Sequence, residues 1–201
     1  MAFGPLRVTF DDRVLRPRTW TVAQAEWAAE VSARVPAGPI LELCSGAGHI
    51  GLAAAVLSGR ALVQVDIDPH ACALAGANAR VNAHSLDVDV RCGDLGAVIG
   101  PDERYPIVLA DPPYLPSANV ASWPSDPRLA IDGGADGLDL PRRCVAVAGA
   151  HLVAGGVALL QLWGVAQLDA LGEDLAGAGL AVVDTRSEDD ERAVALLESR
   201  R

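Results

Sequence analysis

A tetrapeptide near the middle of the chain has the chemistry to hold a planar amino group. It combines a carboxylate, two prolines and an aromatic ring in the order Asp111, Pro112, Pro113 and Tyr114. A planar NH2 group has two hydrogens in its plane, which the Asp111 carboxylate and the Pro112 carbonyl can accept. The prolines fix the backbone and remove amide donors, and Tyr114 can stack on an amide or a base. These four residues are the candidate catalytic residues.

A glycine loop lies earlier in the chain, where Gly46, Gly48 and Gly51 form a G-x-G-x-x-G pattern. Asp66 follows the first glycine by 20 residues. Glycines let the backbone approach a ligand closely, and a carboxylate at this spacing can accept hydrogen bonds from ribose hydroxyls. The pattern predicts a site for a nucleotide-type cofactor. On these residues alone, a dinucleotide dehydrogenase remains open.

Glu42 favours S-adenosylmethionine over NAD. A carboxylate at this position would repel a pyrophosphate, but it could pair with the α-ammonium of a methionine moiety. Asp94 is placed to accept a hydrogen bond from an adenine amino group, and a turn-forming role fits its spacing equally well. Together with the tetrapeptide, these residues predict methyl transfer onto nitrogen. That reaction depends on in-line positioning of the nitrogen lone pair and needs no strong general base.

The segments that must position these residues alternate short apolar runs with helical patterns, as in a parallel sheet built from βα units. We expect strands at residues 40–43, 61–66, 86–91, 106–110, 156–162, 180–185 and 193–197, with the last two antiparallel. We expect helices at residues 23–35, 49–57, 69–80, 141–152 and 165–176. The long connection over residues 112–137 is expected to cover the active site.

Length and composition predict a single domain over residues 1–201, with residues 1–38 as an N-terminal extension before the first core strand. No run of about 20 apolar residues is present, and four scattered cysteines form neither a zinc motif nor a disulfide framework. We therefore expect a cytoplasmic protein without a membrane span or a metal. The formal charge of −10 disfavours a large nucleic-acid substrate.

The chain resembles the class I S-adenosylmethionine-dependent methyltransferases, and among them the HemK/PrmC family, which methylates a glutamine side chain in peptide-chain release factors. Residues 40–48 resemble the cofactor motif of that family, and residues 126–138 resemble its segment after the catalytic tetrapeptide. Residues 15–19 resemble its Pro-Arg approach to the cofactor pocket. The family tetrapeptide normally begins with Asn, and this chain has Asp111 instead.

The resemblance implies a Rossmann-like α/β fold with a seven-stranded, mostly parallel sheet, the last strand antiparallel and helices on both faces. It implies S-adenosyl-L-methionine as cofactor, bound by Glu42, Ser45, Gly46, Gly48, Asp66, Ile67, Asp94, Leu95 and Thr19. The expected acceptor is a protein glutamine, and a small partner subunit could assist as it does in shorter relatives. Alternatives are an adenine or guanine amino group in rRNA or tRNA, and a non-catalytic cofactor-binding subunit.

Overall fold

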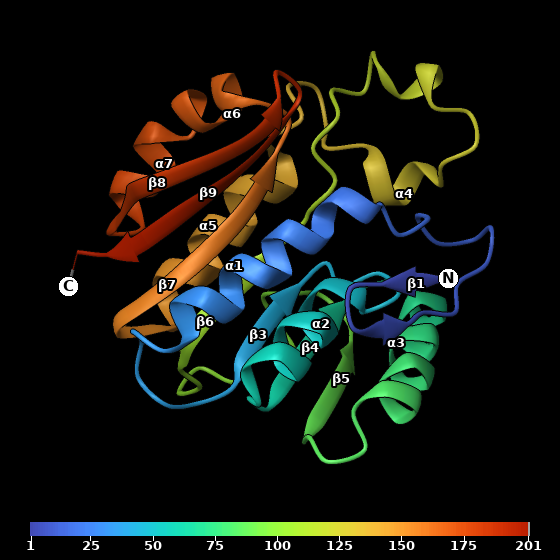
Figure 1. The fold of residues 1–201 in the computed structure, drawn as a ribbon. Coiled ribbons are helices and arrows are strands. Elements are labelled where there is room, and N and C mark those ends of the chain that lie inside the picture. The colour runs from blue at the N-terminus through green and yellow to red at the C-terminus, as the bar shows by residue number, and fades with distance from the viewer. Residues whose placement is uncertain (201) are drawn as a thin grey trace.

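A seven-stranded sheet runs through the computed structural model, which describes residues 1–200 (Figure 1). The strand order is β5-β4-β3-β6-β7-β9-β8, and β9 is antiparallel to both of its neighbours. The strands are β3 (Ile40–Leu43), β4 (Leu62–Asp66), β5 (Val88–Cys92), β6 (Tyr105–Ala110), β7 (Leu152–Leu162), β8 (Leu180–Asp189) and β9 (Arg192–Ser199). This is the sheet that the sequence predicts, with the last strand antiparallel.

Helices cover both faces of the sheet (Figure 1). One face carries α1 (Val22–Ser32), α2 (His49–Ser58) and α3 (Pro69–Asn82). The other carries α5 (Asp139–His151), α6 (Val165–Ala170) and α7 (Gly172–Gly177). The short elements are the strands β1 (Ala2–Phe3) and β2 (Leu6–Arg7), the 3-10 helices η1 (Thr19–Thr21) and η2 (Val120–Ser122), and the helix α4 (Arg128–Ile131). Within residues 1–200, no helix has both the length and the apolar character of a membrane span.

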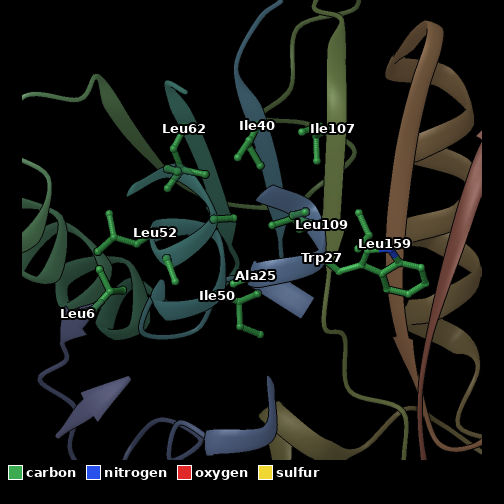
Figure 2. Close-up of a cluster of buried hydrophobic side chains, with 14 of the residues drawn as sticks. Leu6, Ala25, Trp27, Ile40, Ile50, Leu52, Leu62, Ile107, Leu109 and Leu159 are labelled. Atoms are coloured by element: carbon green, nitrogen blue, oxygen red, sulfur yellow. The ribbon is translucent and has the colours of Figure 1, made fainter. Parts of the chain in front are cut away.

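Side-chain alternation along the strands divides the apolar core between these two faces. Ile40 packs in the cluster beneath α1 and α2, whereas Leu41 and Leu43 pack in the cluster beneath α5 and α7. Figure 2 shows Trp27 of α1 beside Leu159 in the first of these clusters. Both faces of the central strands are therefore buried, which explains their nearly continuous apolar sequence.

The observed elements depart from the predicted ones in several places. The single helix predicted over residues 165–176 is wrong, because the chain forms α6 and α7 with Leu171 between them. Leu171 is completely buried, so the break lets it fill the core. The α5 helix begins at Asp139, which puts Pro141 third in its first turn, and β7 begins at Leu152 rather than at residue 156. The β1–β2 hairpin is too short to show an alternating pattern.

The parallel strands place the predicted site residues at one edge of the sheet. The β3 strand pairs in parallel with β4 and β6, and β4 pairs in parallel with β5. Their carboxyl ends lead into the glycine loop after Leu43, into Asp66, into Asp94 and into Asp111. Ligands of open α/β sheets bind at this edge.

Trp27 anchors α1 to the sheet, and replacing it is expected to destabilise the fold. Its side chain is 1% exposed, whereas that of Trp123 is 44% exposed. Trp27→Ala should lower the free energy of unfolding in urea by roughly 3–5 kcal/mol, because it leaves a large cavity in the core. Trp123→Ala serves as the control and should change the free energy of unfolding by less than about 0.5 kcal/mol. Equal effects of the two variants would contradict this packing.

Candidate active site

A cavity of about 660 Å³ opens at the carboxyl edge of the sheet. Eight of the residues predicted for the site line it: Ser45, Gly46, Asp66, Ile67, Asp94, Leu95, Asp111 and Pro113. A second, more open groove of about 1110 Å³ lies between α5 and α7 and contains none of the predicted residues. The predicted site residues therefore gather at the smaller cavity, whose volume suits a ligand of cofactor size.

The two glycines at the start of the loop have different structural roles. Gly46 (φ 53°) lines the cavity, and a Cβ atom there would have no neighbour within 4 Å. Gly48 (φ 78°) does not line the cavity. A Cβ atom on Gly48 would lie 2.6 Å from the Gln64 side chain and 2.9 Å from that of Ala75. Gly46 therefore permits the left-handed turn and leaves the loop backbone open to a ligand. Gly48 instead lets α2 begin close to β4 and α3.

Asp66 ties the glycine loop to the end of β4. Its carboxylate accepts hydrogen bonds from the Gly46 N–H at 2.7 Å and from the Asp68 N–H at 2.9 Å. Burial raises the pKa of Asp66 above its usual range. Each oxygen keeps a further lone pair, so the carboxylate can still accept hydrogen bonds from a diol. Asp68 itself caps α3 by accepting from the His70 N–H, as its place before Pro69 predicts.

Ser45 presents an unpaired polar atom at the glycine loop. The residue is 3% exposed and lines the cavity. Its hydroxyl has no hydrogen-bond partner in the part of the chain that the structure describes. Buried polar atoms are nearly always paired, so an unpaired one on a cavity wall indicates a group reserved for a ligand.

Asp94 lies on the cavity wall beside the buried side chain of Leu95. Its carboxylate forms an ion pair with Arg143 at 2.7 Å, which holds the pKa of Asp94 below its usual range. It also accepts from the Gly96 N–H, which is the turn-forming role that the sequence left open. The turn and the position on the wall are compatible, because a carboxylate accepts several hydrogen bonds.

Glu42 lies away from the cavity wall. Strand alternation turns its side chain under α2, where it accepts hydrogen bonds from the Gly51 N–H at 2.7 Å and the Gln64 side-chain amide at 2.6 Å. Burial raises the pKa of Glu42 to about 7. This carboxylate of β3 thus links the first turn of α2 to the side chain of Gln64 in β4. Its structural partners differ from the ammonium group that the sequence predicts for it.

Thr19 also lies off the wall, since it is exposed in η1. The N-terminal segment contributes three neighbouring residues instead: Arg13, Val14 and Leu15. Nothing in the sequence around these three residues predicts a binding role. Their place on the wall results from the path of the N-terminal segment across α3, where Asn78 and Asn82 bind the backbone of residues 7 and 9.

The tetrapeptide presents only some of its residues to the cavity. Asp111 and Pro113 line it, whereas Pro112 is buried and Tyr114 is half-buried away from the cavity lining. The Asp111 carboxylate has no hydrogen-bond partner among residues 1–200, and burial raises its pKa to about 7. Burial also raises the pKa of the Tyr114 phenol. The site therefore contains a desolvated carboxylate with free acceptor positions.

The glycine-rich segment after α4 holds the tetrapeptide in place. The Leu115 N–H donates to the Ile131 carbonyl, and the Leu115 carbonyl accepts from the Gly133 N–H at 2.8 Å. A Cβ atom on Gly133 would lie 2.7 Å from the Pro113 carbonyl. The Tyr114 carbonyl accepts a 2.8 Å hydrogen bond from the Gln167 amide. This close backbone approach is the physical reason for the glycines in residues 126–138.

His49 is a wall residue that the sequence did not assign to the site. Its ring packs edge-on against Phe3 at 4.7 Å, and Nδ1 has no partner within the described chain. Burial lowers the pKa of His49 to about 4, so the ring is neutral at pH 7. Cys44 also lines the wall, and a hydrogen bond with Cys144 raises the pKa of its thiol. Its position directly after Gly48, within the glycine pattern, is the sequence signal that could have assigned His49 to the site.

Part of the 112–137 connection borders the cavity, as predicted. Besides Pro113, its wall residues come from α4 and its ends: Pro127, Arg128, Leu129, Ala130 and Asp132. Leu129 is 64% exposed beside the cavity. The Arg18–Asp126 ion pair at 2.5 Å connects this segment to the approach of η1.

Comparisons with known proteins agree with this geometry. Residues 28–122 match the family model of the methyltransferase small domain. The release factor glutamine methyltransferase of Deinococcus radiodurans is 36% identical over 166 residues, which are 80% of this chain and 58% of the relative. These similarities support a class I methyltransferase of the HemK/PrmC type. This methyltransferase chain thus spans a little over half the length of that curated relative.

Two further proteins show how far the similarity extends. The ribosomal protein uL3 glutamine methyltransferase of Bradyrhizobium diazoefficiens is 40% identical over 124 residues, or 58% of this methyltransferase chain and 38% of the relative. The hMettl16 catalytic domain, solved with an RNA hairpin, superposes with a TM-score of 0.76 at 16% identity, covering 98% of this chain and 76% of the other. The second match shows a shared Rossmann-like fold.

The buried Glu42 is expected to make the stability of this methyltransferase depend on pH. Its pKa is about 7 in the folded protein and has its ordinary value near 4.5 in the unfolded chain, so the folded state holds the proton more tightly. Its stabilising contribution is complete below about pH 4.5 and is lost as the pH rises through about 7. Relative to Glu42→Gln, the wild type should lose up to about 3 kcal/mol of unfolding free energy between pH 4.5 and 8.

Urea denaturation at a series of pH values measures this difference. The matched control is Glu26→Gln on the exposed face of α1, whose stability should follow that of the wild type at every pH. A constant difference between Glu42→Gln and the wild type across this range would contradict the buried environment of Glu42.

Proposed function

We propose that this chain transfers the methyl group of S-adenosylmethionine to the side-chain amide nitrogen of a protein glutamine. The observation that carries the proposal is the Asp111 carboxylate, which lines the cavity beside the glycine loop without a hydrogen-bond partner in the described chain. The two similar curated proteins are named for the methylation of glutamine in a release factor and in ribosomal protein uL3. A release factor and ribosomal protein uL3 are therefore the candidate acceptors for this chain.

The cavity suits this cofactor. The unpaired Ser45 hydroxyl and the open face of Gly46 lie at one part of the wall, where they would contact the methionine moiety. Asp66 would accept from the ribose hydroxyls, with Ile67 and Leu95 as apolar contacts for the adenine. When bound, the cofactor supplies a methyl group on a sulfonium centre, which is an activated electrophile. Glu42, Gly48 and Thr19 would support the site from outside its wall.

Asp111 and Pro112 would orient the acceptor. The Asp111 carboxylate and the Pro112 carbonyl, which accepts no hydrogen bond among residues 1–200, would each accept one hydrogen of the glutamine amide. The nitrogen lone pair then faces the methyl carbon. As the N–C bond forms and the S–C bond breaks, the nitrogen becomes acidic, and Asp111 with its pKa of about 7 can take the proton. Tyr114 would contact the amide plane.

The alternative acceptor, a nucleobase amino group, is suggested by Asp111 itself, since Asp at this position is commoner in enzymes that methylate adenine or guanine. The charges around the cavity argue against it. A nucleobase acceptor would favour a basic strip near the pocket mouth, for which the sequence offers Arg16, Arg18, Arg128, Arg142 and Arg143. Four of these five arginines form ion pairs: Arg18 with Asp126, Arg128 with Asp132, Arg142 with Asp136 and Arg143 with Asp94. Neutralised arginines attract phosphates weakly, so a protein acceptor fits better.

A methyl-transfer assay tests the proposal. Labelled S-adenosylmethionine is incubated with a release factor and with uL3, and mass spectrometry locates the product. We expect Asp111→Ala to lower the transfer rate at least about 100-fold, because the amide loses its orientation. Binding of S-adenosylhomocysteine, measured by thermal shift, should persist. Methylation confined to RNA would support the nucleobase alternative. Cofactor binding without methyl transfer to either protein would support the non-catalytic alternative.

The pH profile provides a separate test of Asp111. Its ionised form offers two acceptor oxygens, whereas its protonated form loses acceptor capacity, so the transfer rate of the wild type should fall as the pH drops through about 7. Asp111→Asn restores the residue of the related family and does not titrate. We expect it to remain active and to lack this acidic limb. If the transfer rates of both proteins fall at the same acidic pH, the titrating group is a residue other than Asp111.

A further inference from the structure

The Tyr114 end of the tetrapeptide, which does not line the cofactor cavity, has its own charged surroundings. Three charged side chains from distant segments act electrostatically on the Tyr114 phenol: Arg18, Asp126 and Arg192. Arg18 and Asp126 form an ion pair at 2.5 Å, so their charges largely cancel. Arg192 is the remaining cation of the three. It is the first residue of β9, next to the turn of the β8–β9 hairpin.

Arg192 is held in a defined position. Its guanidinium lies over the Trp20 ring, 5.2 Å from the centroid. Its Nε and Nη2 atoms donate to the Asp189 carboxylate. Nη1 lies 3.4 Å from a Glu188 oxygen and makes no hydrogen bond within the part of the chain that the structure describes. The guanidinium therefore retains N–H groups for a further acceptor, and its side chain is 34% exposed.

The hairpin turn is packed against the same end of the molecule as the tetrapeptide. A Cβ atom on Gly164 would collide with the Asp190 carbonyl, so the turn lies directly against the segment between β7 and α6. Gln167 of α6 in turn binds the Tyr114 carbonyl. Figure 1 shows the β8–β9 turn at the end of the sheet where the connection after β6 begins. Arg192, Trp20 and Tyr114 thus belong to one surface, made by segments far apart in sequence.

The charge around Arg192 restricts what it can bind. Residues 188–191 are Glu188, Asp189, Asp190 and Glu191. Four carboxylates next to one guanidinium would repel a phosphate or a carboxylate ligand. A neutral acceptor such as a peptide carbonyl carries no such penalty, and a guanidinium N–H bonds it strongly. The surface therefore fits an uncharged stretch of polypeptide.

We propose that Arg192 is a positioning residue for the acceptor polypeptide, donating an Nη1 hydrogen bond to a backbone carbonyl beside the target glutamine while the flanking chain lies against Trp20 and Tyr114. This inference rests on the proposed function and adds to it the side from which the acceptor enters. The cofactor then reaches Asp111 through the cavity, and the acceptor approaches along the Tyr114 end of the tetrapeptide. Loss of Arg192 should weaken binding of the acceptor and leave binding of the cofactor unchanged.

The same hairpin provides a matched control. Arg186 of β8 also lies over a tryptophan ring, that of Trp27 at 4.2 Å, and also forms an ion pair, with Glu30 at 2.8 Å. It has no electrostatic effect on Tyr114 comparable to that of Arg192. Arg186→Ala therefore removes equivalent stacking and charge from the hairpin at a distance from the tetrapeptide.

Steady-state kinetics with a release factor or uL3 as acceptor tests the proposal. We expect Arg192→Ala to raise the KM for the acceptor about tenfold with little change in kcat, and Arg192→Lys to recover part of the loss. Arg186→Ala should retain the wild-type KM. The affinity for S-adenosylhomocysteine, measured by calorimetry, should be the same in all four proteins.

Failure of this inference can be distinguished from failure of the proposed function. If the wild type methylates a protein glutamine and Arg192→Ala has the same acceptor KM as Arg186→Ala, only the role of Arg192 is overturned. A fall in cofactor affinity in Arg192→Ala would equally overturn it. If the wild type methylates no protein glutamine, the proposed function falls, and the role of Arg192 falls with it.

Discussion

The parallel pairing of four neighbouring strands is the constraint on which the rest of the structure depends. Because β3, β4, β5 and β6 run in the same direction, their carboxyl ends deliver the glycine loop, Asp66, Asp94 and Asp111 to one edge. The hydrogen bond from the Gly46 N–H to Asp66 joins two of these ends directly. A change in register by one residue would turn these side chains to the wrong face.

Backbone rigidity supports this arrangement on both sides of the cavity. Glu42 binds the first turn of α2 through Gly51, while Gly133 and Gln167 hold the backbone around the tetrapeptide. Rigid supports matter for methyl transfer because the acceptor nitrogen must face the methyl carbon within a narrow angular range. Three groups of wall residues have no hydrogen-bond partner among residues 1–200: Ser45 Oγ, His49 Nδ1 and the Asp111 carboxylate.

Electrostatics distinguish the two sides of the tetrapeptide. On the Asp111 side, burial raises the pKa of Asp111 to about 7, and repulsion from Asp111 adds to the effect of burial on the pKa of Glu42 beneath α2. On the other side, arginines are matched with carboxylates, and Arg192 stands among acidic residues. With a net charge of −10 and its arginines paired in this way, the molecule offers little attraction to a phosphate backbone.

The sequence by itself determined the sheet, its antiparallel last strand, the glycine loop and the tetrapeptide, because these depend on local periodicity and on turn residues that few folds tolerate. It could not place Glu42 beneath α2 or Thr19 off the wall, since a motif records spacing and not the direction of a side chain. Only the tertiary structure brought His49 and residues 13–15 to the cavity and Arg192 within electrostatic reach of Tyr114. These neighbours meet through long-range packing, which leaves no signal in the residues next to each one.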